Sequence, residues 1–375
     1  MKVTRLAIVL SMLVLNLTSI LGFSPTPHKR VDALALSTNG AAEFTNIEDL
    51  VQYGRKNGLN EAESLRFYFV WIARNIHYDA DELKAEKRDA AKQEPEAVFR
   101  QRKAICRGYA DLLTVICQKA GIPCRSVAGY TNSGEQAGRD DLHAWNAIEV
   151  NQNWYLFDVT WASNYLENGG EIDDRFEGYF SQTAQHFVRR HFPFDPVWQL
   201  SDYVLPKDAF FCGDTEGVTH DKTYFGDYKK IISAETGLDW AEQGIRSFER
   251  ALAFLPDEKR LYEALNYYKS EKAGFQFRQS RILLEKIRNI NENDLQNWTM
   301  RDVDNFLQDA SKAKFLLEQA HNLYQNMNAS VNEEEMAARQ ENLATIGQNK
   351  SVADKMIVFL ESVKSEIKKI PIARK

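Results

Sequence analysis

The sequence is poor in cysteine. Its 375 residues include only four, which are Cys106, Cys117, Cys124 and Cys212. So few cysteines in a chain of this length do not form a disulfide framework, although the spacing leaves one pair between Cys124 and Cys212 open. None of the cysteines stands in the paired C-x-x-C arrangement of a zinc site. The sequence therefore predicts no metal site and no cofactor.

Blocks of basic residues are also absent. The 47 lysines and arginines and the 53 aspartates and glutamates are spread along the chain and give a formal net charge of −6. A weakly acidic protein without a basic patch has no general attraction for phosphate backbones, which argues against nucleic acid as a partner. The hydrophobic content of 44%, with 11% aromatic residues, is instead typical of a globular protein, and the length suits about two domains.

Long apolar runs are absent after the first 23 residues. Residues 6–23 form such a run, LAIVLSMLVLNLTSILGF, with Lys2 and Arg5 before it and polar residues after it. This is the layout of an export signal. We therefore expect residues 1–23 to direct the protein to the periplasm or out of the cell, either as a cleaved signal peptide or as an uncleaved membrane anchor. No cysteine follows the run, which excludes attachment as a lipoprotein.

Apolar patterning divides the rest of the chain. Residues 24–44 are polar and mixed, and we expect a linker there. Residues 45–205 contain predicted helices followed by short runs rich in β-branched and aromatic residues, an order that indicates an α+β domain with an antiparallel sheet. Residues 206–235 are expected to form a second linker, and residues 236–375 an all-helical region.

Two long stretches of the all-helical region repeat apolar residues at a spacing of three and four, as in a coiled coil. One lies within residues 303–327 and the other within residues 343–367. Ser330 and Glu333 match a capping box between them. We expect a long antiparallel helical hairpin, which offers a surface to a protein partner and to which we assign no chemistry.

The stretch AICRGYADLL, residues 104–113, places Cys106 at the first turn of a predicted helix. Unpaired backbone N–H groups and the positive end of the helix dipole favour the thiolate there, and the same groups can stabilise an oxyanion at an attacked carbonyl. Gly108 would let a substrate backbone come close. An isolated helical cysteine is nevertheless a common core residue, so a catalytic role requires a base and an orienting group.

Two later residues can supply these groups. His143 begins a predicted strand over residues 143–150, and Asp158 lies on the next one, over residues 154–161. If the polar turn between them has two residues, 150 pairs with 153 and 145 lies opposite 158. His143 and Asp158 are then diagonal neighbours on one face of the sheet, whereas a three-residue turn without a bulge would place them on opposite faces.

A carboxylate on one nitrogen of His143 would fix its tautomer and aim the other nitrogen at Cys106. The alternatives are a core histidine and an aspartate that caps a turn. Two other histidines, His186 and His191, lie near aromatic residues, but the sequence shows no partner for either and we assign them no role.

Three segments, C-x-G-Y-A from Cys106, H-A-W-N from His143 and D-x-T-W from Asp158, together resemble the transglutaminase-like superfamily. The flanking sequence is similar to the branch that includes kyphoscoliosis-type peptidases and many exported bacterial proteins, and the resemblance covers about residues 45–205. It implies a papain-like core, with the cysteine on a helix and the histidine and aspartate on successive strands. It also implies that Cys106 is the nucleophile, His143 the base and then the acid, and Asp158 the group that orients the imidazole.

The resemblance leaves the acyl acceptor open. Attack of the thiolate on an amide gives the same acyl-enzyme in hydrolysis by water and in transfer to an amine. Trp145 and Trp161 are candidates to bind substrate and shield the acyl-enzyme, or else to pack the sheet. Trp71 and Gln101 are candidates for the second donor to the oxyanion.

The sequence therefore supports an exported thiol enzyme, a protease or a transglutaminase-type acyltransferase, that acts on a peptide or protein substrate such as a cell-wall peptide. The rival hypothesis from another class is a catalytically silent scaffold of the cell envelope. A third is an interaction protein whose helical region does the main work. The complete set of Cys106, His143 and Asp158 favours the enzyme, since loss of the thiol is the simplest route to a silent homologue.

Overall fold

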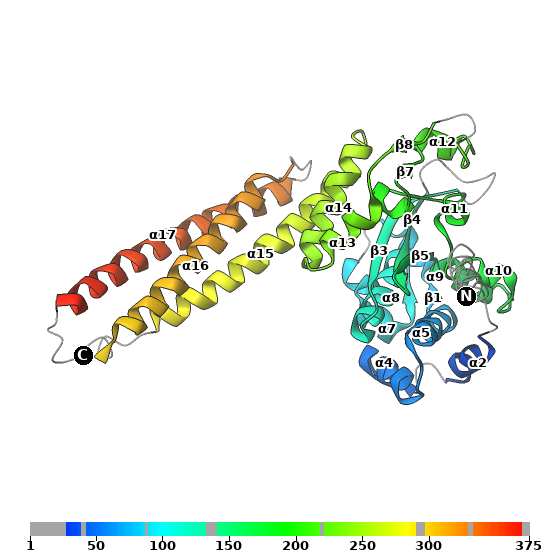
Figure 1. Ribbon diagram of the computed structural model, residues 1–375, viewed down its shortest axis with the longest axis horizontal. Coiled ribbons are helices and arrows are strands. Elements are labelled where there is room, and N and C mark those ends of the chain that lie inside the picture. The colour runs from blue at the N-terminus through cyan, green and yellow to red at the C-terminus, as the bar shows by residue number, and fades with distance from the viewer. Residues whose placement is uncertain are drawn as a thin grey trace, which may run out of the picture. The chain divides into compact units, whose positions relative to one another are not determined.

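The computed structural model describes residues 28–38, 43–86, 89–132, 141–217, 221–289, 297–328 and 333–369. The chain divides into two compact units, Met1–Ser233 and Ala234–Lys375 (Figure 1). The expected export segment, residues 1–23, and Ser330 of the expected capping box lie outside the described residues. Within the described ranges, no helix combines the length and the apolar character needed to cross a membrane.

The first unit begins with helices that pack on a strongly apolar one. They are α2 (Lys29–Ser37), α4 (Ile47–Lys56), α5 (Glu61–Asn75), α6 (Ala80–Lys84), α7 (Pro95–Gln101) and α8 (Cys106–Ala120). Helix α5 is buried on nearly every side from Ser64 to Ala73, as its apolar sequence leads one to expect. Asn60 and Glu63 form the predicted capping box at its start. Helix α8 ends where Gly121 follows it in the left-handed region, at φ 84°.

The central sheet has antiparallel strands in the order β5-β4-β3-β6. They are β3 (Cys124–Thr131), β4 (Leu142–Val150), β5 (Asn153–Phe157) and β6 (His191–Pro193). Asn151 and Gln152 join β4 to β5, and their positive φ values of 51° and 64° are those of a two-residue type I′ turn. Val150 therefore pairs with Asn153, which confirms the predicted register. Helix α8 packs against β3 and β4.

The remaining elements before the long helices are short. They are β1 (His77–Tyr78), η1 (Ala90–Gln93), β2 (Lys103–Ala104), α9 (Val159–Glu167), α10 (Asp174–Glu177), α11 (Ala184–Phe187), η2 (Pro196–Gln199), β7 (Tyr203–Val204), α12 (Lys207–Phe211), β8 (Thr223–Tyr224) and α13 (Tyr228–Glu235). Strand β1 pairs in parallel with β2, and β7 pairs antiparallel with β8. The prediction of an α+β fold is confirmed.

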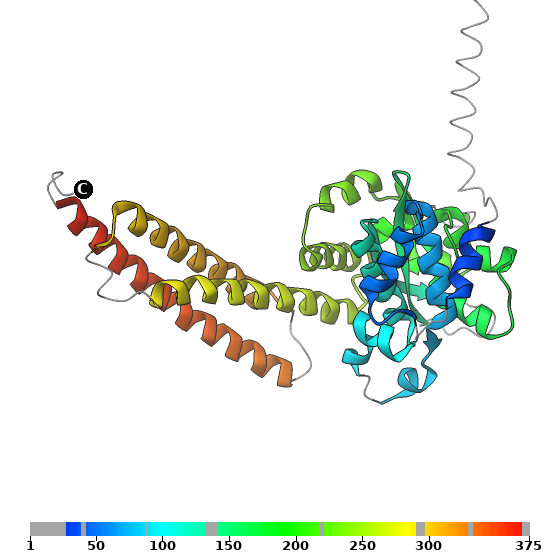
Figure 2. The ribbon, with the colours of Figure 1, turned by 90° about the horizontal axis from the view of Figure 1, so that it is seen from below.

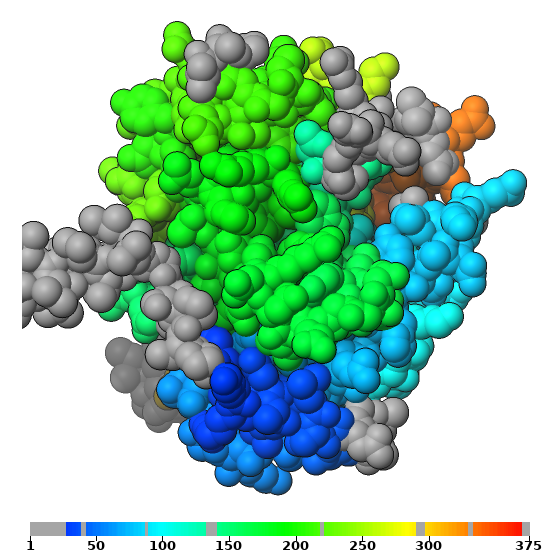
Figure 3. All heavy atoms as spheres, turned by 90° about the vertical axis from the view of Figure 1, so that its right-hand side faces the viewer, coloured from blue at the N-terminus to red at the C-terminus, as the bar shows by residue number. Residues whose placement is uncertain are grey.

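Within the segment expected to be a linker, residues 24–44, the described residues 28–38 and 43–44 instead form part of the first unit. Helix α2 buries two apolar side chains, Val31 and Ala35. Its Asp32 accepts a hydrogen bond of 2.6 Å from Nε of Arg66, a fully buried residue of α5, and Glu177 accepts another of 2.9 Å from Nη1. Figure 3 shows the dark-blue surface of α2 bordering green surface from the middle of the chain. Local composition could not reveal this helix, because a buried cation far along the chain helps to hold it.

The second expected linker, residues 206–235, is also structured. Phe210 of α12 is buried, and its ring lies 5.4 Å from that of Phe192 on β6, between centroids. Strand β8 pairs with β7, and Ile232 of α13 belongs to an apolar cluster with Trp198. The expectation of a linker is wrong here because contacts with residues distant in the sequence, and not a local pattern, order this segment.

The second unit is built from long helices. They are α14 (Trp240–Phe254), α15 (Arg260–Arg288), α16 (Met300–Gln325) and α17 (Glu333–Lys369). Helix α16 packs against both α15 and α17, as Figures 1 and 2 show. Small and medium apolar side chains fill these contacts, among them Ala273, Leu284, Ala313, Leu317, Ala320, Ile346 and Ala353. Helices α16 and α17 correspond to the expected hairpin, and the contribution of α15 to the same core is an addition to it.

Candidate active site

Cys106 is the first residue of α8, and its side chain is half-buried. Ile105 before it has an extended backbone, with φ −89° and ψ 175°. Among the described residues no side chain caps the helix, so none competes for the N–H groups at its start. These N–H groups and the helix dipole stabilise negative charge, first on a thiolate and then on an oxyanion.

Gln93 holds the turn before Cys106. Its Oε1 accepts a hydrogen bond of 3.0 Å from the backbone N–H of Ile105, and its side chain is buried. A Cβ atom on Gly108 would lie 2.6 Å from the same oxygen and 2.9 Å from Cβ of Ala104. Gly108 therefore serves the close packing of this turn, and not the approach of a substrate that the sequence suggested.

Of the two sequence candidates for a second oxyanion donor, Gln101 is engaged elsewhere, whereas Nε1 of Trp71 has no hydrogen-bond partner among the described residues but lies in the core. Trp71 is fully buried, and its ring stacks on Phe99 with the centroids 5.2 Å apart. The amide of Gln101 donates to two backbone carbonyls, at 2.7 and 2.8 Å. Gln93 was missed by sequence reasoning, although it lies beside the start of α8, and its buried amide nitrogen has no hydrogen-bond partner in the part of the chain that the structure describes.

His143 and Asp158 meet. His143 lies on β4, and its Nε2 is 2.8 Å from Oδ2 of Asp158. Asp158 is not on a strand, however, because β5 ends at Phe157 and Asp158 is the N-cap of α9, where its Oδ1 accepts a hydrogen bond of 2.9 Å from the N–H of Trp161. The expectation of a strand as far as residue 161 is wrong, since this cap begins a helix. One carboxylate thus orients a histidine and caps a turn, two roles that the sequence treated as alternatives.

The other nitrogen of His143 is left for the thiol. Because Nε2 is occupied by Asp158, only Nδ1 remains for a second side-chain partner. The thiol of Cys106 is close enough to this imidazole to be among the groups that raise the pKa of His143. The structure therefore brings together the three residues that the sequence singled out, in the order thiol, imidazole, carboxylate.

A second histidine, His191, joins this group. Its Nε2 lies 3.0 Å from the same Oδ2 of Asp158, and its side chain is buried. The expectation that His191 has no partner is wrong. It lies at the start of β6, which reaches the site by pairing with β3 and not through a hairpin, so no short-range pattern in the sequence could have found it.

Burial and mutual contact set the charges of these groups. Burial disfavours the charged form of His143, but Asp158 and Cys106 outweigh this and raise the pKa of His143 to about 10. Burial also opposes ionisation of Asp158, yet the two imidazoles hold the pKa of Asp158 well below its usual range. His191 shows the opposite balance, because burial lowers its pKa to about 4 in spite of the carboxylate. At neutral pH the cluster therefore contains a carboxylate, an imidazolium and a neutral imidazole.

The two tryptophans flank the imidazole of His143. The ring of Trp161 stacks on it with centroids 5.3 Å apart, and that of Trp145 lies at 6.2 Å. Trp145 is only 1% exposed, so it packs the sheet and cannot contact a substrate in this conformation. Trp161 is half-buried and remains accessible at the edge of the site.

Buried hydrogen bonds fix the element that carries the thiol against the element that carries the imidazole. Nδ2 of Asn146, on β4, donates to the carbonyl of Ala110 at 2.9 Å and to Oγ1 of Thr114 at 3.0 Å, both on α8. Asn146 is fully buried. Since β4 also carries His143, this amide sets the distance between the two catalytic candidates.

A second set of buried bonds fixes α8 against α9, whose cap is the carboxylate. The hydroxyl of Tyr109 on α8 donates to the carbonyl of Ile76 at 2.6 Å and lies 3.0 Å from Oγ of Ser163 on α9. Ser163 donates to the same carbonyl at 2.9 Å. The three elements of the site are thus tied together beneath it.

The two imidazoles and the carboxylate are also a donor set that zinc accepts. The nearest nitrogen and oxygen atoms of His143, Asp158 and His191 lie within 4.8 Å of one another. Both Nε2 atoms, however, face a carboxylate oxygen at hydrogen-bond distance, which requires a proton on each nitrogen, whereas a metal ion requires a lone pair there. The arrangement fits hydrogen bonding, and we assign no metal to it.

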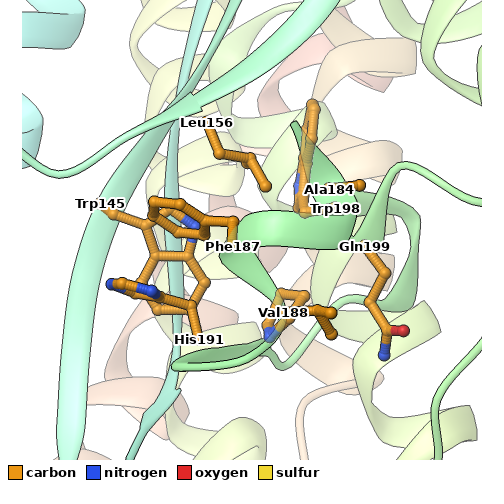
Figure 4. A pocket seen from close by; sticks show the side chains of 9 residues that line it. Trp145, Leu156, Ala184, Phe187, Val188, His191, Trp198 and Gln199 are labelled. Atoms are coloured by element: carbon orange, nitrogen blue, oxygen red, sulfur yellow. The ribbon is translucent and has the colours of Figure 1, made fainter. Parts of the chain in front are cut away.

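A small cavity lies on the far side of His191. Its volume is about 10 Å³, the space of one water molecule, and Figure 4 shows Trp145, Phe187, Trp198 and Gln199 around it. A substrate does not fit there.

The other cysteines take no part in this site. Cys117 and Cys124 are buried and Cys212 is exposed, and all four cysteines are free thiols. The pairing of Cys124 with Cys212 that the spacing left open does not form. Burial raises the pKa of Cys117, which makes it a poor nucleophile.

Part of the chain is similar to known proteins. Residues 48–159 match the transglutaminase-like superfamily. The chain is similar to kyphoscoliosis peptidase of Mus musculus, with 30% identity over 186 residues, 47% of this chain and 27% of the relative. The Homo sapiens protein of that name is 32% identical over 166 residues, 42% and 24% of the two chains. Hillarin of Drosophila melanogaster is 26% identical over 198 residues, 47% and 23%. The chain thus spans about a quarter of the length of these relatives.

Two solved structures are similar to part of the chain. The crystal structure of a TGase covers 40% of this chain and 37% of its own, at 18% identity and a TM-score of 0.26. A proposed cysteine protease from Cytophaga hutchinsonii covers 36% of this chain and 37% of its own, at 22% identity and a TM-score of 0.23.

Proposed function

We propose that the protein is a thiol enzyme that acts on peptide or protein amides, a cysteine protease or a transglutaminase-type acyltransferase, a proposal that the match of residues 48–159 to the transglutaminase-like superfamily supports. Cys106 is the nucleophile, His143 the acid and base, and Asp158 the group that orients His143. The observation that carries the proposal is the Asp158–His143 hydrogen bond of 2.8 Å, buried beside a thiol at a helix start. The name of the similar kyphoscoliosis peptidase supports the class of reaction.

The chemistry runs in two steps. Thiolate Sγ of Cys106 attacks the amide carbon, and the carbonyl oxygen becomes an oxyanion beside the N–H groups at the start of α8. The C–N bond then breaks, the imidazolium of His143 gives its proton to the leaving amine, and a thioester remains. His143, now neutral, takes a proton from the attacking water or amine, the thioester breaks, and the thiolate–imidazolium pair returns.

Asp158 contributes by keeping His143 charged and aligned in the resting state. Its carboxylate is fully buried and ionised, so it offsets the burial of the imidazolium and raises the pKa of His143 to about 10. A stable imidazolium in turn favours the thiolate of Cys106. The half-buried Trp161, stacked on His143, lies where it can limit access of water to the thioester.

We further propose that residues 1–23 export the protein, to the periplasm or out of the cell, and that they anchor it to the membrane if they are not removed. The apolar run that follows Lys2 and Arg5 supports this. Cell-wall peptides are then within reach as substrates. Fractionation of cells that carry the full chain, with residues 1–23 deleted as the comparison, tests it, and an unchanged distribution would contradict it.

The competing function is binding of a protein partner without turnover. The second unit supports it, because α15, α16 and α17 expose large apolar side chains, among them Phe275, Ile282, Phe315, Val358 and Phe359. Reactivity of the thiol separates the two functions, since a scaffold has no need of an activated cysteine.

Alkylation by iodoacetamide, followed at each cysteine by mass spectrometry, tests the enzyme. At pH 6.5, below the ordinary pKa of a thiol of about 8.5, we expect half-buried Cys106 to react at least about tenfold faster than exposed Cys212. Cys212 is the matched control, because exposure alone would make it the faster one. In His143→Ala, alkylation of Cys106 should slow to the rate seen at Cys212. Equal rates in the wild type would contradict the enzyme and favour the scaffold.

A second assay separates hydrolysis from transfer. The protein is incubated with casein and a fluorescent primary amine, with Cys106→Ala as the control. Incorporation of the amine that the control lacks indicates transfer, and new peptides without incorporation indicate hydrolysis. If Cys106 is reactive but neither product forms, the substrate is a peptide that casein does not contain.

A further inference from the structure

Asp158 holds two imidazoles on one oxygen. Its Oδ2 lies 2.8 Å from Nε2 of His143 and 3.0 Å from Nε2 of His191, while Oδ1 caps α9 through the N–H of Trp161. A carboxylate in a triad needs only the first of these contacts to orient the base. Orienting the base does not require the contact with His191. This contact is buried, because His191 is 4% exposed and Asp158 is 0% exposed.

The ring of His191 is fixed in place by aromatic neighbours. Phe187 stacks on it with centroids 3.8 Å apart and planes 20° apart. Trp161 lies at 4.6 Å and Trp145 at 5.0 Å. Figure 4 shows the rings of Trp145, Phe187 and His191 packed together. A ring held on these sides cannot turn its nitrogen away from Asp158 without moving the aromatic cluster.

A glycine makes room for an aromatic ring that contacts His191. Gly129 of β3 is opposite His143 on β4 and opposite Pro193 on β6. A Cβ atom on Gly129 would lie 2.1 Å from the carbonyl oxygen of Phe192 and 2.6 Å from the ring of Trp145. The absence of a side chain at Gly129 therefore leaves space for Trp145, whose ring packs against that of His191.

From this geometry we propose that His191 is a positioning residue, which donates a second hydrogen bond to Asp158 and thereby fixes the carboxylate that orients His143. The inference deepens the proposed function and rests on it. His191 does not touch the reacting atoms and acts through Asp158 alone.

The charges around His191 agree with the role of a neutral donor. The groups that face it are Asp158 at the start of α9, His143 on β4 and the backbone of Phe187 on α11. Burial lowers the pKa of His191 to about 4, so the ring is neutral over the whole range in which a thiol enzyme works. A neutral ring has one N–H, and donation to Asp158 requires that the proton be on Nε2.

Loss of this hydrogen-bond donor should make Cys106 less reactive. Without it, the ionised form of Asp158 loses one of its hydrogen bonds in a buried place, and the pKa of Asp158 rises, because His191 is among the groups that lower it. When Asp158 is less readily ionised, it stabilises the positive charge of His143 less. His143 in turn stabilises the negative charge of the Cys106 thiolate less. Alkylation of Cys106 at a given acidic pH should therefore slow.

The experiment compares the pH profile of Cys106 alkylation in three variants of the full chain, all measured with EDTA present. His191→Phe keeps an aromatic ring and removes the donor, and His191→Gln keeps an N–H donor near the position of Nε2. His186→Phe is the control, on the same helix as Phe187 but exposed. We expect the acid limb of His191→Phe to move up by about one pH unit, which is about tenfold in rate on that limb. His191→Gln should recover at least half of the shift, and His186→Phe should match the wild type.

A measurement on the wild type covers the case in which His191→Phe does not fold. The ¹⁵N shifts of the histidine rings at pH 7 report which nitrogen carries the proton, and we expect a neutral His191 with its proton on Nε2. A proton on Nδ1 overturns the inference. An unchanged acid limb in a folded His191→Phe overturns it as well, and so does a shift that His191→Gln fails to reduce, because ring shape and not donation would then matter.

Two further outcomes point to other conclusions. If wild-type Cys106 reacts no faster than Cys212, the proposed function fails and the inference with it, whereas a reactive wild type with an unaffected His191→Phe overturns the inference alone. A wild-type profile that EDTA changes would overturn it too, since the cluster would then hold a metal ion.

Discussion

The two units of the molecule bury different kinds of side chain. Between the long helices of the second unit the core is mostly apolar, and the polar bond from Gln276 on α15 to Gln319 on α16, at 2.7 Å, lies near its margin, where Gln276 is still 6% exposed. In the first unit, polar groups that link two elements are fully buried, as Asn146 is, which bonds from β4 to α8. A buried bond between elements sets a distance, whereas apolar packing tolerates small displacements. The comparison places the chemistry in the unit where distances are fixed.

Among substitutions that test this difference between the two units, we expect the largest loss of activity at Asp158. Asp158→Asn keeps a cap for α9 but removes the carboxylate that holds two imidazoles, so Cys106-dependent activity should fall about 10³- to 10⁴-fold. Asp173→Asn is the matched control, because Asp173 is also a helix N-cap, accepts from the N–H groups of Arg175 and Phe176, and is remote from histidine. Turnover measured on both variants checks the prediction. A comparable loss in Asp173→Asn, or none in Asp158→Asn, would contradict it.

A substitution in the second unit should have the opposite outcome. Leu317→Ala removes a fully buried side chain from the core of α15, α16 and α17, and should lower the free energy of unfolding of this unit by about 2–5 kcal/mol. Alkylation of Cys106 should not change, because no fixed polar contact is lost. Phe315→Ala, at 56% exposure, is the control on the same helix and should stay within about 0.5 kcal/mol. Denaturant unfolding measures the free energies. Slower alkylation of Cys106 in Leu317→Ala would contradict the proposed difference between the two units.

The third effect concerns pH. The raised pKa of His143, about 10 against an unfolded value of about 6.5, adds stability that is complete below pH 6.5 and is lost as pH rises through 10. The lowered pKa of Asp158 adds stability that is present above about pH 4 and is lost at lower pH. The thermal midpoint of the first unit should therefore fall between pH 7 and pH 10, and His143→Gln should flatten the fall. A wild-type thermal midpoint that does not fall between pH 7 and pH 10 would contradict the pairing of a charged His143 with Asp158.

Sequence patterns predicted the parts of the site that lie close together in the chain. The two-residue turn after Val150 set the register of β4 and β5, and so the approach of His143 to Asp158. The position of Cys106 followed from the helical repeat and its start. Both depend on contacts between neighbours in sequence, which periodicity and turn residues report.

The remaining features depend on contacts between distant residues. His191 reaches the site because β6 pairs with β3, and nothing near His191 in the sequence indicates that pairing. Local composition predicts a linker where helix α2 lies, because Arg66, which bonds to Asp32 of α2, is on another helix. Asp158 stands after a run of strand-forming residues, and only its hydrogen bond to Trp161 shows that a helix starts there.

The double use of Asp158 has a consequence for how the protein responds to heat. Oδ1 holds the first turn of α9 and Oδ2 holds the imidazoles, so a single side-chain torsion governs both. When that turn frays, the carboxylate swings away from His143 although the remainder of the unit is still folded. Inactivation should then come at a lower temperature than melting and be reversed on cooling, so that the end of one short helix sets the working limit of the catalyst.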